Sequence, residues 1–198
     1  MNLKLVLPSL ALILFLFLIF KKEEVYEPQI FKGNIMGTTY NIILQSDVSA
    51  EDAHIEAYNI LQKVNLEMST YIDDSLISKV NKADIGQWVT VSQDFLDVLS
   101  FATTLCKDTQ GIYDVSIGKL VNLWGFGPDS VDKQPSAEEL SYFSSQVGCN
   151  SIETDPTNLA IKKAKDIELD FSSIAKGFAL DKVYEFLIKQ SYLNSFFI

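Results

Sequence analysis

The chain has 198 residues, of which 47% are hydrophobic and 21% are charged, so it can fill the core of one ordinary domain and is not a disordered protein. Its formal net charge is −10, and all 16 basic residues are lysines. An acidic chain without arginine lacks the bidentate cation that nucleic-acid sites favour, so we expect no nucleic-acid partner. A bound phosphate would have to be held by lysine, by backbone N–H groups or by a metal ion.

The first 22 residues are predicted to form an apolar helix that attaches the chain to a membrane. Leu5–Phe20 is almost entirely apolar and is flanked by lysines. Sixteen helical residues span about 24 Å, which is short of the hydrocarbon core of about 30 Å and fits a signal sequence or a short anchor. No small-residue cleavage site follows, so we expect an uncleaved signal-anchor over residues 1–22. A polar linker over residues 23–29 and a domain over residues 30–198 follow, with the domain on the outer or periplasmic face of the inner membrane.

The next elements along the chain indicate a mixed α and β domain with hairpins and single helices. Strands are predicted where β-branched and aromatic residues cluster or alternate, at 30–44 with a break at Gly33-Asn34, and at 88–91, 151–153, 159–162 and 166–171. Helices are predicted where apolar residues recur every three or four positions after a capping residue, at 49–68, 74–80, 92–111, 136–148 and 172–187. In the helix over 136–148, Leu140, Phe143 and Val147 are expected to be buried. We therefore expect an α+β fold in which a largely antiparallel sheet packs against helices.

The two cysteines, Cys106 and Cys149, lack the spacing of a zinc site. Cys106 falls on the apolar side of a predicted helix, and Cys149 follows a glycine that is expected to end another helix. Two buried free thiols are the favoured interpretation. A disulfide is the alternative if the domain is exported.

The segment Gly111–Pro128 reads GIYDVSIGKLVNLWGFGP and contains four glycines within eighteen residues. Such a density of glycine indicates backbone that turns sharply or approaches a ligand closely. Trp124 and Phe126 supply flat apolar faces, and Asp114 supplies a hydrogen-bond acceptor. The segment is therefore interpreted either as a binding loop or as a structural surface loop fixed by its tryptophan.

A second candidate site lies where the predicted strand ending at Asp170 meets a predicted helix. The first turn of a helix offers backbone N–H groups and a positive dipole end to an anion. Ser173 would add a hydroxyl oxygen of the kind that Mg²⁺ accepts, and Lys176 would add a positive charge. In the alternative interpretation, Ser172 or Ser173 is only an N-cap and Lys176 is a solvated surface residue. The single histidine, His54, has no partner set for nucleophilic catalysis, so no catalytic residue is assigned.

Four segments in this order resemble the FAD:protein FMN transferases, the ApbE family. They are Met36-Gly-Thr38, Met68–Tyr71 with Ser75–Asn81, Gly111–Pro128, and Asp170–Asp181. The resemblance implies an exported, membrane-attached, Mg²⁺-dependent enzyme that transfers FMN from FAD to a Thr or Ser hydroxyl of a partner flavoprotein, of the redox-pump subunit type, and releases AMP.

By the same resemblance, the family's metal contact corresponds to Ser173 in this chain. Its flavin contacts correspond to Met36, Tyr71, Ile112, Tyr113, Asp114, Asp170 and Lys176. In this arrangement, the FAD diphosphate would lie over the helix start at Ser173, with the Asp114 loop beside it. Asp114-Val-Ser116 and Gly118-Lys119 lack the prolines that the family usually has there, which predicts a looser loop.

The family pattern continues beyond the point that matches Ile198, so the resemblance implies an ApbE-like domain that is truncated at its C-terminus. Two functions follow as alternatives. One is the transferase activity of the family, and the other is a non-catalytic, membrane-anchored remnant that binds a flavin nucleotide weakly or not at all.

Overall fold

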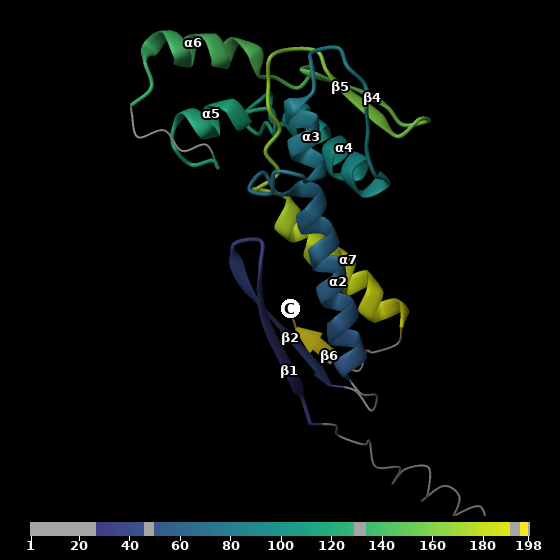
Figure 1. Ribbon diagram of the computed structural model, residues 1–198. Helices are drawn as coiled ribbons and strands as arrows, with labels where there is room; N and C mark the ends of the chain where they lie inside the picture. The colour runs from purple at the N-terminus through teal and green to yellow at the C-terminus, as the bar shows by residue number, and fades with distance from the viewer. Residues whose placement is uncertain (1–26, 46–49, 129–133, 191–194, 198) are drawn as a thin grey trace, which may run out of the picture.

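The computed structural model describes residues 27–45, 50–128, 134–190 and 195–197. These residues form helices and two antiparallel sheets, which confirms the expected α+β class (Figure 1). None of the helices within these ranges is long and apolar enough to cross a membrane. The predicted signal-anchor over residues 1–22 and most of the linker over residues 23–29 lie outside the described residues.

The first sheet packs beside two long helices at one end of the molecule (Figure 1). Its strands, in spatial order, are β1 (Gln29–Ile35), β2 (Thr38–Gln45) and β6 (Ser195–Phe197). The helices are α2 (Ala50–Met68) and α7 (Ala175–Lys189), which contact each other along their lengths. Alternate residues of β2 and one stripe of each helix are buried together, which is the arrangement that their apolar periodicity predicts.

The turn of the first hairpin lies three residues later than the sequence pattern suggested. Gly33 pairs with Tyr40 inside the ladder, and the chain turns at Met36 and Gly37, which both have positive φ angles. Two consecutive positive φ angles are typical of a tight two-residue hairpin loop. A side chain at Gly33 would collide with the Tyr40 ring, because a Cβ atom there would lie 2.5 Å from it. This glycine therefore allows a close packing contact and does not break the strand.

The second sheet and four further helices gather around the other end of α2 (Figure 1). Its strands, in spatial order, are β3 (Val89–Thr90), β5 (Ala160–Lys163) and β4 (Ile152–Asp155). The helices are α3 (Leu76–Lys82), α4 (Gln93–Asp108), α5 (Gly118–Leu123) and α6 (Ala137–Gln146). The predicted caps are present, since Ser92 caps α4 and Ser136 forms a complete capping box with Glu139.

Three expectations in this half are wrong in detail. The glycine-rich segment contains a short helix, α5, and α6 buries none of its side chains, so Leu140, Phe143 and Val147 are only half-buried. Residues 166–171 do not form a strand of a sheet, because their one ladder contact is an isolated bridge between Glu168 and Ile117.

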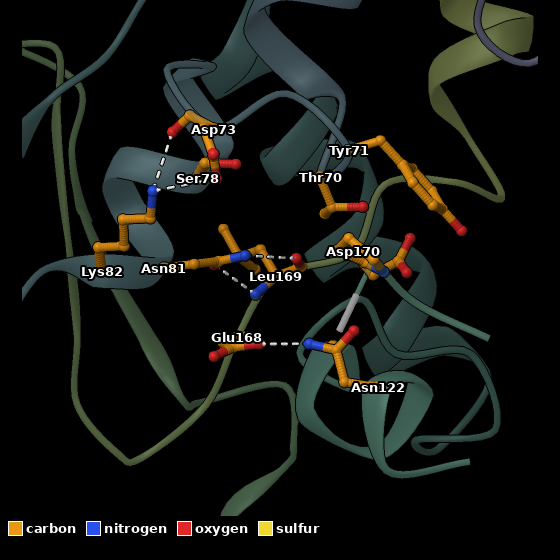
Figure 2. A pocket seen from close by; sticks show the side chains of 12 residues that line it. Thr70, Tyr71, Asp73, Ser78, Asn81, Lys82, Asn122, Glu168, Leu169 and Asp170 are labelled. Atoms are coloured by element: carbon orange, nitrogen blue, oxygen red, sulfur yellow. Dashed lines mark hydrogen bonds and ion pairs between the residues drawn. The ribbon is translucent and has the colours of Figure 1, made fainter. Parts of the chain in front are cut away.

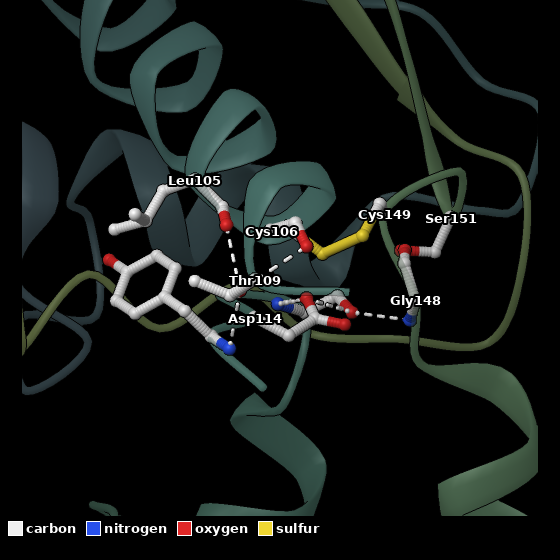
Figure 3. Close-up of a disulfide and its surroundings, with 9 residues drawn as sticks. Leu105, Cys106, Thr109, Asp114, Gly148, Cys149 and Ser151 are labelled. Carbon is white, nitrogen blue, oxygen red and sulfur yellow. Dashed lines mark hydrogen bonds between the residues drawn. A yellow bond between two sulfur atoms is a disulfide. The ribbon is translucent and has the colours of Figure 1, made fainter. Parts of the chain in front are cut away.

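The two cysteines are joined by a disulfide, so the prediction of two free thiols is wrong. Cys106 is buried near the end of α4, as its position on the apolar side of the helix suggested. Cys149 directly follows the turn after α6, and the fold brings this turn against α4 (Figure 3). The pairing depends on contacts between segments 43 residues apart, which helix periodicity does not report.

Candidate functional site

The glycine-rich segment Gly111–Pro128 lies directly against the segment that leads into α7. The backbone N–H of Asp170 donates to the carbonyl of Val115 at 2.8 Å, and the N–H of Gly118 donates to the carbonyl of Glu168 at 2.8 Å. Gly118 has to be small here, since a Cβ atom would lie 2.8 Å from the Glu168 carbonyl oxygen. The two stretches that the sequence singled out are therefore neighbours.

Side chains also connect these two segments. The hydroxyl oxygens of Tyr113 and Ser173 are 3.1 Å apart and share a hydrogen bond. Lys119 forms an ion pair with Asp166, and the amide of Asn122 donates to Glu168 at 3.0 Å. The hydrogen bond from Lys119 holds the pKa of the Asp166 carboxyl below its ordinary value. Three side chains of the glycine-rich segment thus fix the position of the segment that leads into α7.

The Asp114 loop has a defined shape because its own side chains bind its backbone. One carboxylate oxygen of Asp114 accepts hydrogen bonds from the N–H of Ser116 at 2.8 Å and from its hydroxyl at 2.7 Å. The hydroxyl of Thr109 accepts a hydrogen bond from the N–H of Tyr113 at 3.1 Å. Such bonds from Asp and Thr side chains to nearby N–H groups stabilise tight turns.

The start of α7 differs from the expected serine-capped helix. The helix begins at Ala175 with Ile174 at the cap position, where no side chain makes a capping bond. A carboxylate oxygen of Asp170 accepts a hydrogen bond from the N–H of Ser172 at 2.7 Å, so an aspartate-stabilised turn precedes the helix. The N–H groups of Ile174 and Ala175 donate to the carbonyl of Phe171. Fewer backbone donors are therefore available to an anion than a simple helix start would offer, and Lys176 is the exposed cation of this turn.

Two adjoining cavities open beside these segments, and Thr70 and Tyr71 line both of them. The first has a volume of about 640 Å³ and is mainly apolar. Its lining includes Met36, Met68, Tyr71, Phe126, Ser172 and Lys176. The hydroxyl of Tyr71 donates to the carbonyl of Phe126 at 2.9 Å, which connects the end of α2 to the glycine-rich segment.

The second cavity has a volume of about 410 Å³ and is mainly polar. Figure 2 shows its wall, with Asp170 and Asn122 on one side and Asn81 and Lys82 on the other. Lys82 is paired with Asp73 at 3.5 Å at the rim. A molecule with one flat apolar part and one polar part would match this pair of cavities.

The predicted site residues take different places around the cavities. Met36, Tyr71 and Lys176 line the first cavity, and Tyr71 and Asp170 line the second. Tyr113 and Ser173 lie between the two segments through their shared hydrogen bond, and Asp114 shapes the loop next to them. Ile112 is 91% exposed and is not among the described residues that line either cavity.

Asn81 is a site residue to which the sequence assigned no role, although it ends the Ser75–Asn81 motif. Its side-chain amide donates to the carbonyl of Leu169 at 2.9 Å, and its side-chain oxygen accepts from the N–H of Leu169 at 2.7 Å. Lys163 is 5% exposed, and its ammonium donates to the backbone carbonyl of Asn81 at 2.6 Å. Burial lowers the pKa of this lysine, and the nearby charge of Lys119 lowers it further. Asn81 thus fixes the residue directly before Asp170.

The described residues do not complete a coordination shell for a metal ion. They contain no group of three His, Cys, Asp or Glu side chains that could hold one. Ser173 offers one exposed hydroxyl, while Asp114 and Asp170 each use one carboxylate oxygen within their own turns. Mg²⁺ usually keeps several waters and binds one or two carboxylates together with substrate phosphates, so Ser173 could supply only one of its ligands.

Comparison with known proteins shows which family the chain belongs to. The sequence model of the ApbE family matches residues 36–198, which is most of the chain. The chain belongs to the ApbE family. All four segments that suggested this resemblance lie within the matched region.

Relatives within the ApbE family are similar to this chain in sequence and in fold. The chain is 41% identical over 162 residues to the FAD:protein FMN transferase of Haemophilus influenzae, covering 77% of this chain and 47% of the relative. It is 36% identical over 176 residues to that of Vibrio cholerae, covering 87% and 52%. The crystal structure of the Pseudomonas stutzeri flavinyl transferase ApbE superposes with a TM-score of 0.79 at 29% identity, over 85% of this chain and 57% of that one. The V. cholerae flavin transferase ApbE gives 0.80 at 34% identity, over 86% and 56%. The chain spans about half the length of these relatives.

Proposed function

We propose that this chain takes part in transferring FMN from FAD to a Thr or Ser hydroxyl of a partner flavoprotein, in a Mg²⁺-dependent reaction that releases AMP. One observation carries the proposal: the glycine-rich loop and the Asp170–Lys176 turn adjoin the same pair of cavities. Both segments lie within residues 36–198, which match the ApbE family, and relatives of the chain are named FAD:protein FMN transferase.

The first cavity supports the binding of a flat aromatic ring. Met36 and Met68 line it together with the aromatic side chains of Tyr71 and Phe126. Aromatic and methionine side chains make favourable contacts with planar ligands. Lys176, at the edge of the same cavity, would meet a phosphate group, since it is the exposed cation at the start of α7.

The proposed reaction exchanges one phosphorus–oxygen bond for another. The acceptor hydroxyl oxygen bonds to the phosphorus of the FMN half, the pyrophosphate bond breaks, and AMP leaves with the bridging oxygen. The hydroxyl proton passes to a base, to which none of the described residues is assigned. Mg²⁺ would offset the charge of the phosphates, with the Ser173 hydroxyl as one of its ligands. The role of the described residues is to bind and orient the dinucleotide.

We also propose that the domain works outside the cytoplasm, next to the inner membrane, where residues 1–22 anchor it. The disulfide between Cys106 and Cys149 supports an oxidising compartment, since stable disulfides are rare in the cytosol. An acceptor of the redox-pump subunit type, attached to the same membrane, would be within reach of the site.

The test uses the full 198-residue chain in mild detergent with FAD, MgCl₂ and a Thr-containing acceptor flavoprotein. Chromatography measures AMP, and in-gel fluorescence measures flavin bound covalently to the acceptor. A matched acceptor with the target Thr replaced by Val, and a reaction containing EDTA, serve as controls. We expect AMP and fluorescent acceptor in equal amounts, and neither product in the controls.

The other outcomes separate the alternatives. FAD that stays bound without AMP release would identify a non-catalytic flavin-binding protein, and the transferase proposal would be wrong for this chain. Absence of both FAD binding and AMP release would overturn the transferase proposal and would leave the remnant that binds no flavin nucleotide.

A further inference from the structure

The disulfide joins Cys106 in α4 to Cys149 after α6 (Figure 3). Because the glycine-rich segment and α6 lie between these cysteines in the sequence, the bond encloses both of them in one covalent loop. Cys106 is 2% exposed in the last turns of α4, and Cys149 is half-buried after α6. The disulfide is not a flavin contact in the proposed function. Its two ends, however, are each connected to the Asp114 loop by hydrogen bonds.

On the first side, the Asp114 loop is attached to the end of α4. The carbonyl of Cys106 accepts a hydrogen bond from the N–H of Gly111 at 2.8 Å, and the Thr109 hydroxyl, which donates to the Leu105 carbonyl at 2.7 Å, lies 3.3 Å from the Cys106 carbonyl. The same Thr109 hydroxyl accepts a hydrogen bond from the N–H of Tyr113. The backbone at Tyr113 therefore depends on the position of the Cys106 turn.

On the second side, the loop is attached to the turn after α6. The N–H of Gly148 donates to the hydroxyl of Ser116 at 3.1 Å, and this hydroxyl donates to Asp114 at 2.7 Å. The carbonyl of Gly148 in turn accepts from the N–H and the hydroxyl of Ser151. The carboxylate of Asp114 therefore depends on the position of Gly148.

The turn at Gly148 has only partial apolar anchoring, because Val147 before it packs against the core but stays half-buried. Helix α6, which leads into it, buries no side chain, so hydrophobic packing does little to hold this part of the chain. Segments with few buried apolar contacts open at low free-energy cost. The covalent bond from Cys149 to the buried Cys106 adds a second, stronger anchor to this turn.

We propose that the Cys106–Cys149 disulfide is a positioning pair for the FAD site, and that reducing it weakens FAD binding. With the bond intact, Gly148 stays against Ser116 and Tyr113 stays against Ser173, so the loop keeps one shape. Without it, the Gly148 turn separates from Ser116 for part of the time. This inference rests on the proposed function, because it deepens the account of the same site.

The chemistry of the reduction is a thiol–disulfide exchange with a dithiol such as dithiothreitol. Its thiolate attacks one sulfur of the disulfide and forms a mixed disulfide, and its second thiol then releases the protein thiol and closes a ring. Two electrons and two protons pass to the protein, which gains two thiols, and the reductant becomes a cyclic disulfide.

The experiment measures FAD affinity of the full 198-residue chain with and without dithiothreitol, well below the melting temperature of the reduced protein. A thiol assay confirms that two thiols appear. We expect Kd for FAD to rise about tenfold on reduction, which corresponds to a loop that keeps its binding shape about a tenth of the time. The matched control is the double variant Cys106→Ser/Cys149→Ser, whose Kd should equal that of the reduced protein and should not respond to dithiothreitol.

A disulfide that only stabilises the fold gives a different result: reduction would lower Tm and leave Kd unchanged, and the inference would be overturned. Amide hydrogen exchange supplies a readout that needs no FAD. Reduction should remove protection at Ser116 and Gly148 but leave it intact in α2. If the oxidised chain binds no FAD, the proposed function fails, and the exchange data alone decide whether the disulfide holds the loop. Unchanged protection would refute the inference.

Discussion

The half of the molecule built from α2, α7 and the first sheet is held together differently from the two segments that meet beside the cavities. In the first, apolar residues at helix and strand spacing form the contacts, from Leu44 on β2 to Val183 on α7, and both of these are fully buried. In the second, Gly111–Pro128 and residues 164–174 contain little regular structure. Buried side chains such as Leu169 and Phe171 anchor these segments, and hydrogen bonds from side chains to the backbone, one ion pair and a disulfide fix their shape.

The two kinds of support predict different tolerance to amino-acid substitutions. A core formed by many similar apolar contacts distributes its stability over many residues. A site held by a few specific polar groups can lose its shape when one of them is removed, while the core stays folded. Three substitutions separate these two kinds of support.

Phe171→Ala should have the largest effect on stability. The Phe171 side chain is 0% exposed and packs against Phe95 with ring centroids 5.0 Å apart, directly after the site residue Asp170. Removing a buried phenylalanine ring typically costs about 3–5 kcal/mol. Urea unfolding measures this change. Phe126→Ala is the control, since that side chain is 77% exposed and its loss should change the free energy of unfolding by less than about 0.5 kcal/mol. Equal effects of the two substitutions would show that the burial of Phe171 does not stabilise the fold.

Asn81→Ala should have an intermediate effect on stability and should also impair the site. It leaves the N–H and the carbonyl of Leu169 without their partners, which costs about 2 kcal/mol in the free energy of unfolding. Because Asp170 follows Leu169, FAD titration should show weaker binding as well. Asn158→Ala, in the exposed turn between β4 and β5, is the matched control and should leave FAD binding unchanged. If Asn81→Ala lowers stability without changing FAD affinity, Asn81 supports the fold alone.

The smallest effect is expected at Asp94, which connects α4 to α2 and α7. Its carboxylate pairs with Lys63 at 2.7 Å and with Lys182 at 2.9 Å. Burial alone would raise the pKa of Asp94, but the hydrogen bonds from the two lysines outweigh burial and hold the pKa below 3.8. A lowered folded-state pKa means that the stabilisation is present above about pH 4 and is lost as the pH falls through the folded value.

Asp94→Asn should therefore lower the free energy of unfolding by about 1 kcal/mol at pH 7, and this difference should shrink toward pH 3. Thermal unfolding of both proteins between pH 3 and pH 7 measures the effect. A difference that stays constant over this range would show that the charge of Asp94 contributes nothing.

The sequence predicts the two halves unequally, for physical reasons. Helices such as α2 and α4 follow from periodic apolar residues and from caps such as Ser92, which act over a few residues. Helix α5 was missed because Gly118, a poor helix former, is there for its close approach to Glu168. The start of α7 was misplaced because the Asp170 carboxylate binds the N–H of Ser172.

The candidate site was found through its motifs, but its supporting contacts depend on segments that are distant in the sequence. Asn81 acts on Leu169, 88 residues away, and Cys106 pairs with Cys149, 43 residues away. Neither link leaves a local pattern. The resemblance could therefore suggest candidate flavin contacts, while the residues that hold these candidates in place required the structure.

FAD titration of the full chain carrying Lys176→Ala or Lys189→Ala tests the central claim most directly. Both lysines are exposed residues of α7, but Lys176 lines the first cavity beside the glycine-rich segment and Lys189 lies at the far end of the helix. We expect Lys176→Ala to raise Kd for FAD about fivefold or more, a loss typical of a charged group that contacts a phosphate, and Lys189→Ala to leave it unchanged. Equal Kd values for the two variants and the unsubstituted chain would contradict a nucleotide site at the junction of these segments.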